Sequence, residues 1–228
     1  MDQINRTTGQ EPIPRVIHYC WFGRKQKSPL MEKCIASWSK YCPDWEIIEW
    51  NEDNFDVNFC PYAARAYKEK RYGFLADAAR LKIIYENGGV YLDTDVELRR
   101  SLDELLANEA WFGYGSAAEI NTGSGFGAVK GHPFVKLLLE AYLSRPAQGK
   151  YEVCTVFDTR IFRETFPEFA ADHDVAQEFH MDWGGRTWNV RIINNIWHYV
   201  THHYTNTWLP WYKKLYNRIK AVGRRNNA

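Results

Sequence analysis

Two hydrophobic patterns alternate along the chain. Short apolar runs that begin or end at Pro or Gly are typical of buried strands, and they lie at residues 13–23 (IPRVIHYCWFG), 45–51 (WEIIEWN) and 90–98 (VYLDTDVEL). Apolar residues at helical spacing predict helices between these runs, at residues 30–41, 61–70 and 74–87. The last helix stops at Gly88, where a left-handed cap belongs.

The pattern changes after the third strand. Residues 123–134 (GSGFGAVKGHPF) predict a strand and a turn, and residues 133–146 predict an amphipathic helix bounded by prolines. Between residues 148 and 200 we expect short strands and long loops. Strands that alternate with helices predict an α/β fold with a mixed, mostly parallel sheet flanked by helices, and ligands bound beyond the carboxyl ends of the strands. We expect one domain over residues 1–209.

Composition narrows the class of protein. A net charge of +1 over 228 residues argues against a nucleic-acid partner, because binding to phosphate backbones needs a strongly basic surface. The five cysteines lack any CxxC spacing and are expected to be reduced thiols. The first 15 residues are polar, and no window approaches the roughly 18 apolar residues of a membrane span. These features predict a cytoplasmic location.

The C-terminal segment, residues 210–228, differs electrostatically from the rest. It carries six basic residues and no acidic one. Its apolar residues follow a helical stripe, which predicts a basic amphipathic helix. Such a helix could lie on anionic lipids, giving peripheral membrane contact through residues Trp211 to Arg225 at the inner membrane face. The alternative is a helix packed on the domain with a solvated basic face.

Two aspartates one residue apart end the third predicted strand. Period-two alternation points Asp93 and Asp95 to the same side as Tyr91. Two carboxylates so close repel each other unless a cation lies beside them, and such a pair suits Mn²⁺ or Mg²⁺ shared with a phosphate. The alternative is a strand that runs out into a solvated loop. In the preceding helix Asp77 and Arg80 share one face, where they either form an ordinary ion pair or bind hydroxyls.

The run FLADAARLKIIYENGGVYLDTDVEL, with IPRVIHYCWFG before it and NTGSGFGAVKGHPF and HHYTNTW after it, carries a family resemblance. It resembles the sugar-nucleotide glycosyltransferases with a DxD sugar-binding region (glycosyltransferase family 32), which include bacterial capsular-polysaccharide transferases and yeast mannosyltransferases. It is distantly similar to the glucosyltransferase domain of the clostridial toxins. The resemblance covers roughly residues 13–140 and 198–209. It implies a GT-A type nucleotide-sugar-binding fold.

The resemblance also implies roles for individual residues. The catalytic set would be Asp77, Arg80, Asp93 and Asp95. The nucleotide-sugar would contact Trp21, which stacks on the base, together with Tyr19, Asp77, Arg80, Asp93, Asn121, Thr207 and the lid residue Trp208. The metal would be held by Asp95, His203 and Asn206. Thr207 stands where the family usually has serine, so the hydroxyl is retained.

The implied activity is metal-dependent transfer of a hexose, with galactose or an N-acetylhexosamine favoured, from a UDP-sugar to a glycan acceptor with retention of configuration. A lipid-linked saccharide of capsule, O-antigen or lipopolysaccharide assembly is the expected acceptor. Chemically, a divalent cation at Asp95 with Arg80 could neutralise the charge that develops on a leaving diphosphate. Two alternatives are a metal-dependent phosphohydrolase and a non-catalytic sugar-nucleotide-binding module.

Overall fold

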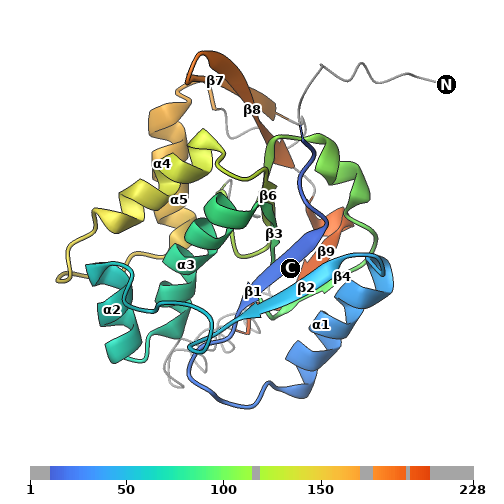
Figure 1. Ribbon diagram of the computed structural model, residues 1–228, viewed down its shortest axis with the longest axis vertical. Coiled ribbons are helices and arrows are strands. Elements are labelled where there is room, and N and C mark those ends of the chain that lie inside the picture. The colour runs from blue at the N-terminus through green and yellow to red at the C-terminus, as the bar shows by residue number, and fades with distance from the viewer. Residues whose placement is uncertain (1–10, 115–118, 170–176, 194–195, 206–228) are drawn as a thin grey trace, which may run out of the picture.

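The computed structural model describes residues 11–114, 119–169, 177–193 and 196–205. Its larger sheet has seven strands (Figure 1), in the order β2 (Glu46–Trp50), β1 (Val16–Cys20), β3 (Gly89–Tyr91), β6 (Phe126–Ala128), β5 (Ala110–Gly113), β8 (Arg186–Ile193) and β7 (Gln177–Trp183). Strand β1 is parallel to β2 and β3, and β5 is parallel to β8. Strands β6 and β7 run antiparallel to their neighbours. The predicted mixed, largely parallel sheet is confirmed.

The first two helices begin at residues whose side chains cap them. Ser28 caps α1 (Pro29–Tyr41), its hydroxyl accepting from the Met31 amide, and Cys60 caps α2 (Pro61–Lys68) in the same way. The remaining helical segments are α3 (Tyr72–Asn87), η1 (Asp103–Ala107), α4 (Pro133–Leu143), α5 (Cys154–Thr165) and η2 (Ile196–His198). A second sheet pairs β4 (Val96–Leu98) with β9 (Val200–His202).

The large sheet separates two hydrophobic cores. Alternate residues of β1 enter different cores, Ile17 packing with Trp38 of α1 and Cys20 packing with Leu75 of α3. The first core lies against α1, β4 and η1, and the second against α2, α3, α4 and α5 (Figure 1). Both faces of the central strands are covered, which explains why their sequences are almost wholly apolar.

Residues Gly88 and Gly89 turn the chain sharply from α3 into β3. Both have positive φ, 71° and 97°, a region that favours glycine. A Cβ on Gly89 would lie 2.8 Å from the Val16 carbonyl oxygen, so the close packing against β1 also requires glycine. This short connection brings the C-terminal end of α3 directly to the strand that precedes the two aspartates.

The predicted strand over residues 90–98 is interrupted. It divides into β3 and β4, and Thr94 and Asp95 form a turn in which the Val96 amide donates to the Asp93 carbonyl at 3.0 Å. The carboxylates therefore approach each other through a turn rather than through strand alternation. The interruption lets β4 leave the large sheet and pair with β9.

Residues 148–200 are more regular than we expected. They contain the helix α5 and a hairpin in which seven residues of β7 pair with β8. The α5 sequence CTVFDTRIFRET has a buried stripe of Phe157, Asp158, Thr159 and Phe162, in which polar residues occupy core positions and weaken the apolar pattern.

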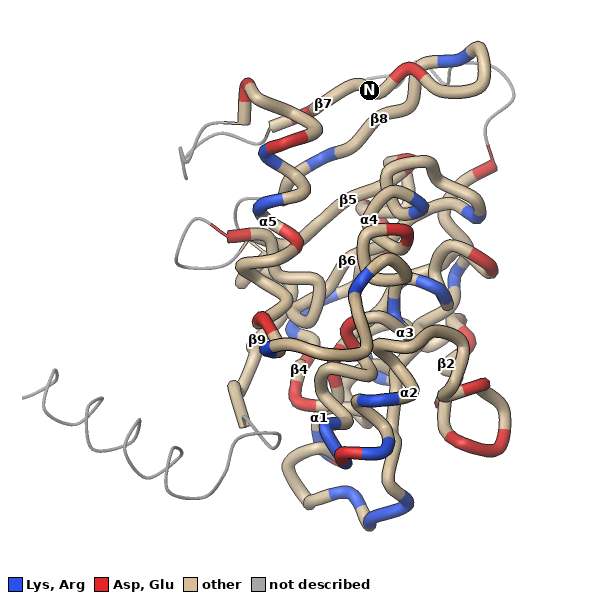
Figure 2. Tube along the Cα trace, turned by 90° about the vertical axis from the view of Figure 1, so that its left-hand side faces the viewer, with Lys and Arg blue, Asp and Glu red and all other residues tan. Residues whose placement is uncertain are grey.

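Other features concern charge, thiols and membranes. Figure 2 shows acidic and basic residues interspersed along the described chain. All five cysteines are free. Within the described ranges, no helix combines the length and the apolar character needed to cross a bilayer. The predicted helix over residues 210–228 lies outside the described residues.

Candidate active site

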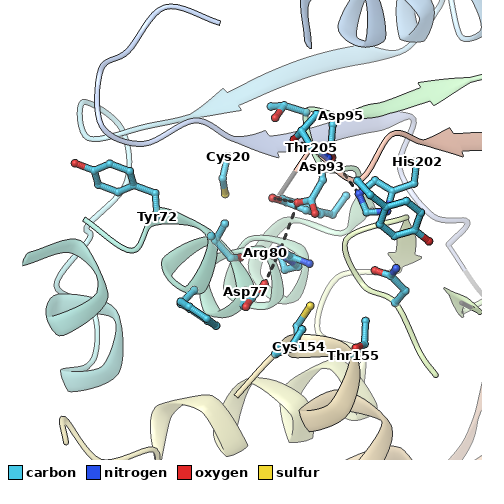
Figure 3. Close-up of a pocket in the computed structure, with 18 of the residues that line it drawn as sticks. Cys20, Tyr72, Asp77, Arg80, Asp93, Asp95, Cys154, Thr155, His202 and Thr205 are labelled. Carbon is cyan, nitrogen blue, oxygen red and sulfur yellow. Dashed lines mark hydrogen bonds and ion pairs between the residues drawn. The ribbon is translucent and has the colours of Figure 1, made fainter. Parts of the chain in front are cut away.

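A pocket of about 370 Å³ opens beyond the carboxyl ends of β1 and β3 (Figure 3). Six of the residues predicted for the site line it: Trp21, Asp77, Arg80, Asp93, Asp95 and Asn121. They come from the end of β1, the middle of α3, the turn after β3 and the loop before β6. The fold thus brings together side chains that are up to 100 positions apart in the sequence (Trp21 to Asn121).

Arg80 is the buried cation of this pocket. The residue is only 2% exposed, and its Nη2 lies 2.8 Å from Asp77 Oδ1 and 3.3 Å from Asp93 Oδ1. The guanidinium also lies over the Tyr91 ring, 4.9 Å from its centroid. A buried ion pair of this type needs several partners to offset its desolvation, and here one guanidinium links α3 to the aspartate turn.

Gly123 allows the loop before β6 to reach that turn. Its carbonyl accepts from the Asp93 amide at 3.0 Å. A Cβ at this position would collide with the Asp93 carboxylate and would lie 3.1 Å from Arg80 Nη1. The glycine-rich sequence was expected to allow close approach of a ligand, and at Gly123 the close approach is to the site's own charged groups.

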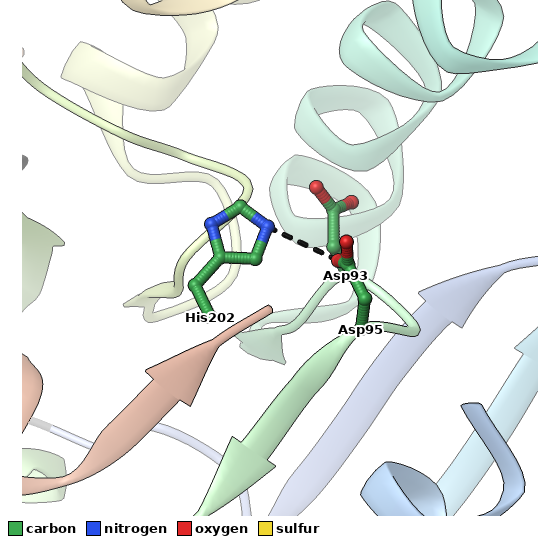
Figure 4. Close-up of side chains that lie close together, drawn as sticks. All are labelled: Asp93, Asp95 and His202. Atoms are coloured by element: carbon green, nitrogen blue, oxygen red, sulfur yellow. Dashed lines mark hydrogen bonds and ion pairs between the residues drawn. The ribbon is translucent and has the colours of Figure 1, made fainter. Parts of the chain in front are cut away.

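Three side chains could hold a cation together (Figure 4). One ligand atom from each of Asp93, Asp95 and His202 lies within 4.8 Å of the others. His202 Nε2 is 3.0 Å from Asp95 Oδ1, and Thr205 donates to Asp95 Oδ2 through both its amide and its hydroxyl, each at 2.8 Å. Two carboxylates and an imidazole fit Mn²⁺, because carboxylate oxygens suit Mn²⁺ and an imidazole accommodates first-row transition metals.

The carboxyl groups of the pocket differ in acidity. Burial raises the pKa of Asp77 to about 6 against the opposing charge of Arg80, and burial also raises the pKa of Asp93. Burial acts on Asp95 as well, but hydrogen bonds from His202 and Thr205 outweigh it and lower the pKa to about 2. Asp95 is therefore ionised at physiological pH and could act as a ligand for a cation.

Two predicted residues lie elsewhere. The Tyr19 ring packs edge-on to Trp38 in the first core, and its hydroxyl donates to Glu49 at 2.6 Å. His203 Nε2 lies 3.0 Å from Glu97, on the outer side of β4. Because β9 alternates its side chains, the neighbouring His202 and not His203 faces Asp95. The predicted Asn206, Thr207 and Trp208 lie outside the described residues.

Sequence reasoning missed several contributors to the pocket. His202 and Thr205 stand in the HHYTNT stretch that was singled out, but only the β4–β9 register shows which residues face the aspartates. Cys154 and Thr155 line the opposite wall at the start of α5 (Figure 3). Nothing in the sequence CTVF predicted a helix there.

The chain is similar in sequence to known glycosyltransferases. Residues 28–112 match the family described as "Glycosyltransferase sugar-binding region containing DXD motif". The chain is 34% identical over 131 residues to inositol phosphoceramide mannosyltransferase 3 of Schizosaccharomyces pombe, covering 54% of this chain and 35% of that protein. It is 28% identical over 153 residues to mannosyltransferase 2 of the same series and organism, covering 61% and 41%. The chain therefore spans less than half the length of these relatives.

One solved structure shares the fold. The "PaToxG Glycosyltransferase" aligns with a TM-score of 0.56 over 69% of this chain and 70% of that chain, at 16% sequence identity. The predicted GT-A type fold is confirmed. The sequence match over the ADxxR and DxD region likewise confirms the predicted relation to the glycosyltransferases with a DXD region.

Proposed function

We propose that this chain, which carries the sugar-binding region of the DXD glycosyltransferases, is a metal-dependent glycosyltransferase that moves a hexose from a nucleotide-sugar to a glycan acceptor. The observation that carries the proposal is the convergence of Asp77, Arg80, Asp93 and Asp95 on one pocket. The DxD triplet is tied to a buried arginine, because Asp93 lies 3.3 Å from Arg80, which also pairs with Asp77 at 2.8 Å.

The pocket has groups for each part of a nucleotide-sugar. Trp21, partly exposed at the rim, offers an aromatic face for the base. Asp77 and Arg80 offer a carboxylate and a guanidinium for sugar hydroxyls, and Asn121 also lines the pocket. Asp93 lies between Arg80 and the candidate cation position, where ribose and sugar hydroxyls could reach it.

The residues that would hold the divalent cation are Asp93, Asp95 and His202. A cation bound there would supply positive charge for the leaving diphosphate. The protein adds the fixed charge of Arg80, which is held before substrate arrives and needs no reorganisation during the reaction. We favour Mn²⁺ over Mg²⁺ because Mg²⁺ prefers a shell of oxygen ligands, and His202 contributes nitrogen.

We propose UDP-galactose or a UDP-N-acetylhexosamine as the donor. A mannose donor is the alternative, because the named relatives are mannosyltransferases. We propose transfer with retention of configuration, as the family resemblance implies. In this mechanism Arg80 stabilises the charge of the leaving group, and no dedicated general base is needed.

The activity is tested by incubating the chain with UDP- and GDP-hexoses and MnCl₂, first for stabilisation against heat and then for transfer and hydrolysis. Ligand binding raises the melting temperature, so the screen names the nucleotide. Asp95→Asn should lower the transfer rate by on the order of 10² or more while the fold is kept. Glu97→Gln is the matched control, since Glu97 lies two residues away on β4 and faces His203.

Three results would contradict the proposal. Activity of Asp95→Asn within a few-fold of wild type would remove Asp95 from the mechanism. Release of phosphate that no saccharide accelerates would indicate the predicted alternative, a phosphohydrolase. Binding of a nucleotide-sugar without turnover would indicate a non-catalytic module.

The acceptor we propose is a lipid-linked saccharide at the cytoplasmic face of a membrane. The support is the charge of residues 211–228, whose six basic residues suit anionic lipids. Deletion of residues 211–228 should abolish binding to vesicles that contain an anionic lipid and should leave hydrolysis of the donor intact. Unchanged vesicle binding would contradict this part of the proposal.

A further inference from the structure

Asp158 is a buried carboxylate that lies behind the pocket and not in it. It sits on the inner face of α5 and is 1% exposed. Its Oδ2 accepts from the Thr122 hydroxyl at 2.8 Å, and its Oδ1 accepts from the Tyr142 hydroxyl of α4 at 3.1 Å. Both partners are neutral hydroxyl groups, and among the described residues none forms a direct ion pair that would offset the cost of burying the carboxylate.

The Thr122 hydroxyl connects this carboxylate to the site. While it donates to Asp158, its oxygen accepts from Arg80 Nη1 at 3.2 Å. Arg80 in turn contacts Asp77 and Asp93 through Nη2. A continuous series of contacts therefore runs from α5, through the loop before β6, to the arginine beside the aspartate turn.

The neighbouring residue reinforces the same connection. The Thr159 hydroxyl oxygen accepts from the Ile120 amide at 2.8 Å. Two successive side chains of α5 thus hold the segment 120–122 from behind. Thr159 binds the backbone of the segment, and Asp158 binds the side chain of Thr122. The loop that carries Thr122 is fixed relative to α5, and the direction of the Thr122 hydroxyl is fixed by Asp158.

The two carboxylate oxygens of Asp158 accept from two different hydroxyls. Burial raises the pKa of Asp158 to about 7, and an amide of the same shape would keep one acceptor oxygen and place an NH₂ donor at the other position. What a carboxylate adds is negative charge behind Thr122, which strengthens the acceptance of the Arg80 N–H by the Thr122 oxygen. The opposite charge of Arg80 in turn favours the ionised form of Asp158.

We propose that Asp158 is a positioning residue for the transfer reaction, which orients Arg80 toward the leaving diphosphate through the Thr122 hydroxyl. This inference rests on the proposed glycosyltransferase function. Arg80 has five N–H donors in a rigid plane, and its direction is set by the acceptors around it. Thr122 and Asp158 fix one side of that plane, while Asp77 and Asp93 fix the other.

The experiment compares four variants with wild type, using MnCl₂ and the nucleotide-sugar that the wild-type chain hydrolyses fastest among UDP-galactose, UDP-N-acetylgalactosamine and GDP-mannose. Thr122→Val removes the hydroxyl and keeps the shape, and Thr122→Ser keeps the hydroxyl. Asp158→Asn removes the charge and keeps the shape. Tyr142→Phe removes the other hydrogen bond of the same carboxylate, which joins α5 to α4 and does not lead to Arg80.

The expected result is a loss in kcat with little change in the Kd of the donor. Thr122→Val and Asp158→Asn should each lower kcat by roughly tenfold, the lower range of effects measured for groups that orient a reacting residue. Thr122→Ser and Tyr142→Phe should each keep the wild-type kcat. The double variant that combines Thr122→Val with Asp158→Asn should be no slower than the slower single variant, because both substitutions interrupt the same connection.

Each contrary outcome has a distinct meaning. If wild type is active and Tyr142→Phe lowers kcat as much as Asp158→Asn, Asp158 is only structural and the inference is wrong. Equal kcat values for wild type, Thr122→Val and Asp158→Asn, all folded by circular dichroism, would also overturn it while leaving the proposed function intact. A wild-type chain that is inactive on every donor would overturn the proposed function and this inference with it.

Discussion

The two walls of the pocket are built differently. One wall is nearly continuous in sequence, since Asp77, Arg80, Asp93 and Asp95 lie within 19 positions and all fall inside the family match at residues 28–112. The second wall is assembled from three separate segments, represented by Asn121, Cys154–Thr155 and the pair His202 and Thr205. The continuous wall carries the charged residues on which the proposed function depends. The assembled wall brings side chains from distant parts of the sequence to the same pocket.

Gly123 is the point where the two walls meet, so we expect its substitution to have the largest effect. A Cβ in Gly123→Ala would collide with the Asp93 carboxylate and displace Arg80. Forcing a group into a packed site typically costs about 1–3 kcal/mol of stability. We expect transfer to fall by on the order of 10² or more, because the misplaced groups are charged and face the reaction. Steady-state kinetics and thermal unfolding would measure both effects.

The control for this prediction is Gly184→Ala at the tip of the β7–β8 hairpin. A Cβ there meets nothing within 4 Å, although its φ of 62° adds some conformational strain. This variant should lose a little stability and no activity. If Gly123→Ala were as active as Gly184→Ala, the tight junction between the walls would have no functional role.

His202 of the assembled wall and the adjacent His203, which lies outside the pocket, should behave differently. His202→Ala removes a candidate ligand beside Asp95 and should weaken Mn²⁺ binding by roughly 10–100-fold, the range typical of lost metal-site groups. His203→Ala removes only a partly exposed contact with Glu97, worth no more than about 1 kcal/mol of stability. Calorimetric titration with MnCl₂ separates them. A larger loss for His203→Ala would restore the assignment predicted from the sequence.

The pH dependence of folding provides a smaller test of the continuous wall. The pKa of Asp77 is raised to about 6, so between about pH 4 and 6 the folded chain binds a proton that the unfolded chain has released. Stability from this group is present below about pH 4 and is lost as pH rises through 6. Asp77→Asn should therefore reduce the fall in stability across this range by on the order of 1–2 kcal/mol, measured by urea unfolding with EDTA present. If the stability of Asp77→Asn fell with pH as steeply as that of wild type, burial would not raise the pKa of Asp77.

The sequence predicted the continuous wall well, because its information is local. Gly88 ends α3, and the spacing of Asp77 and Arg80 places them on one helix face beside the strand that follows. The turn at Thr94 was missed, since Asp and Thr are compatible with the strand pattern that surrounds them. The sequence correctly predicted that the two carboxylates lie close together. It wrongly predicted that strand alternation brings them there, because a turn does so.

The assembled wall could be predicted only in part. The choice between His202 and His203 depends on a one-residue register between β4 and β9, which are more than 100 positions apart. Asp158 was not predicted, because a buried carboxylate is recognised only through its partners, Thr122 and Tyr142. Long-range pairing of this kind leaves no local signal.

The most direct test of the account is whether metal and nucleotide-sugar bind as one unit at Asp95. Isothermal titration of wild type with the donor chosen by the screen should show binding in MnCl₂ that weakens by roughly tenfold or more in EDTA, since the cation links the aspartates to the diphosphate. Asp95→Asn should bind the donor equally weakly in either condition, and Glu97→Gln should match wild type. Equal donor affinity with and without Mn²⁺ in the wild-type chain would contradict the metal-dependent site at Asp93, Asp95 and His202.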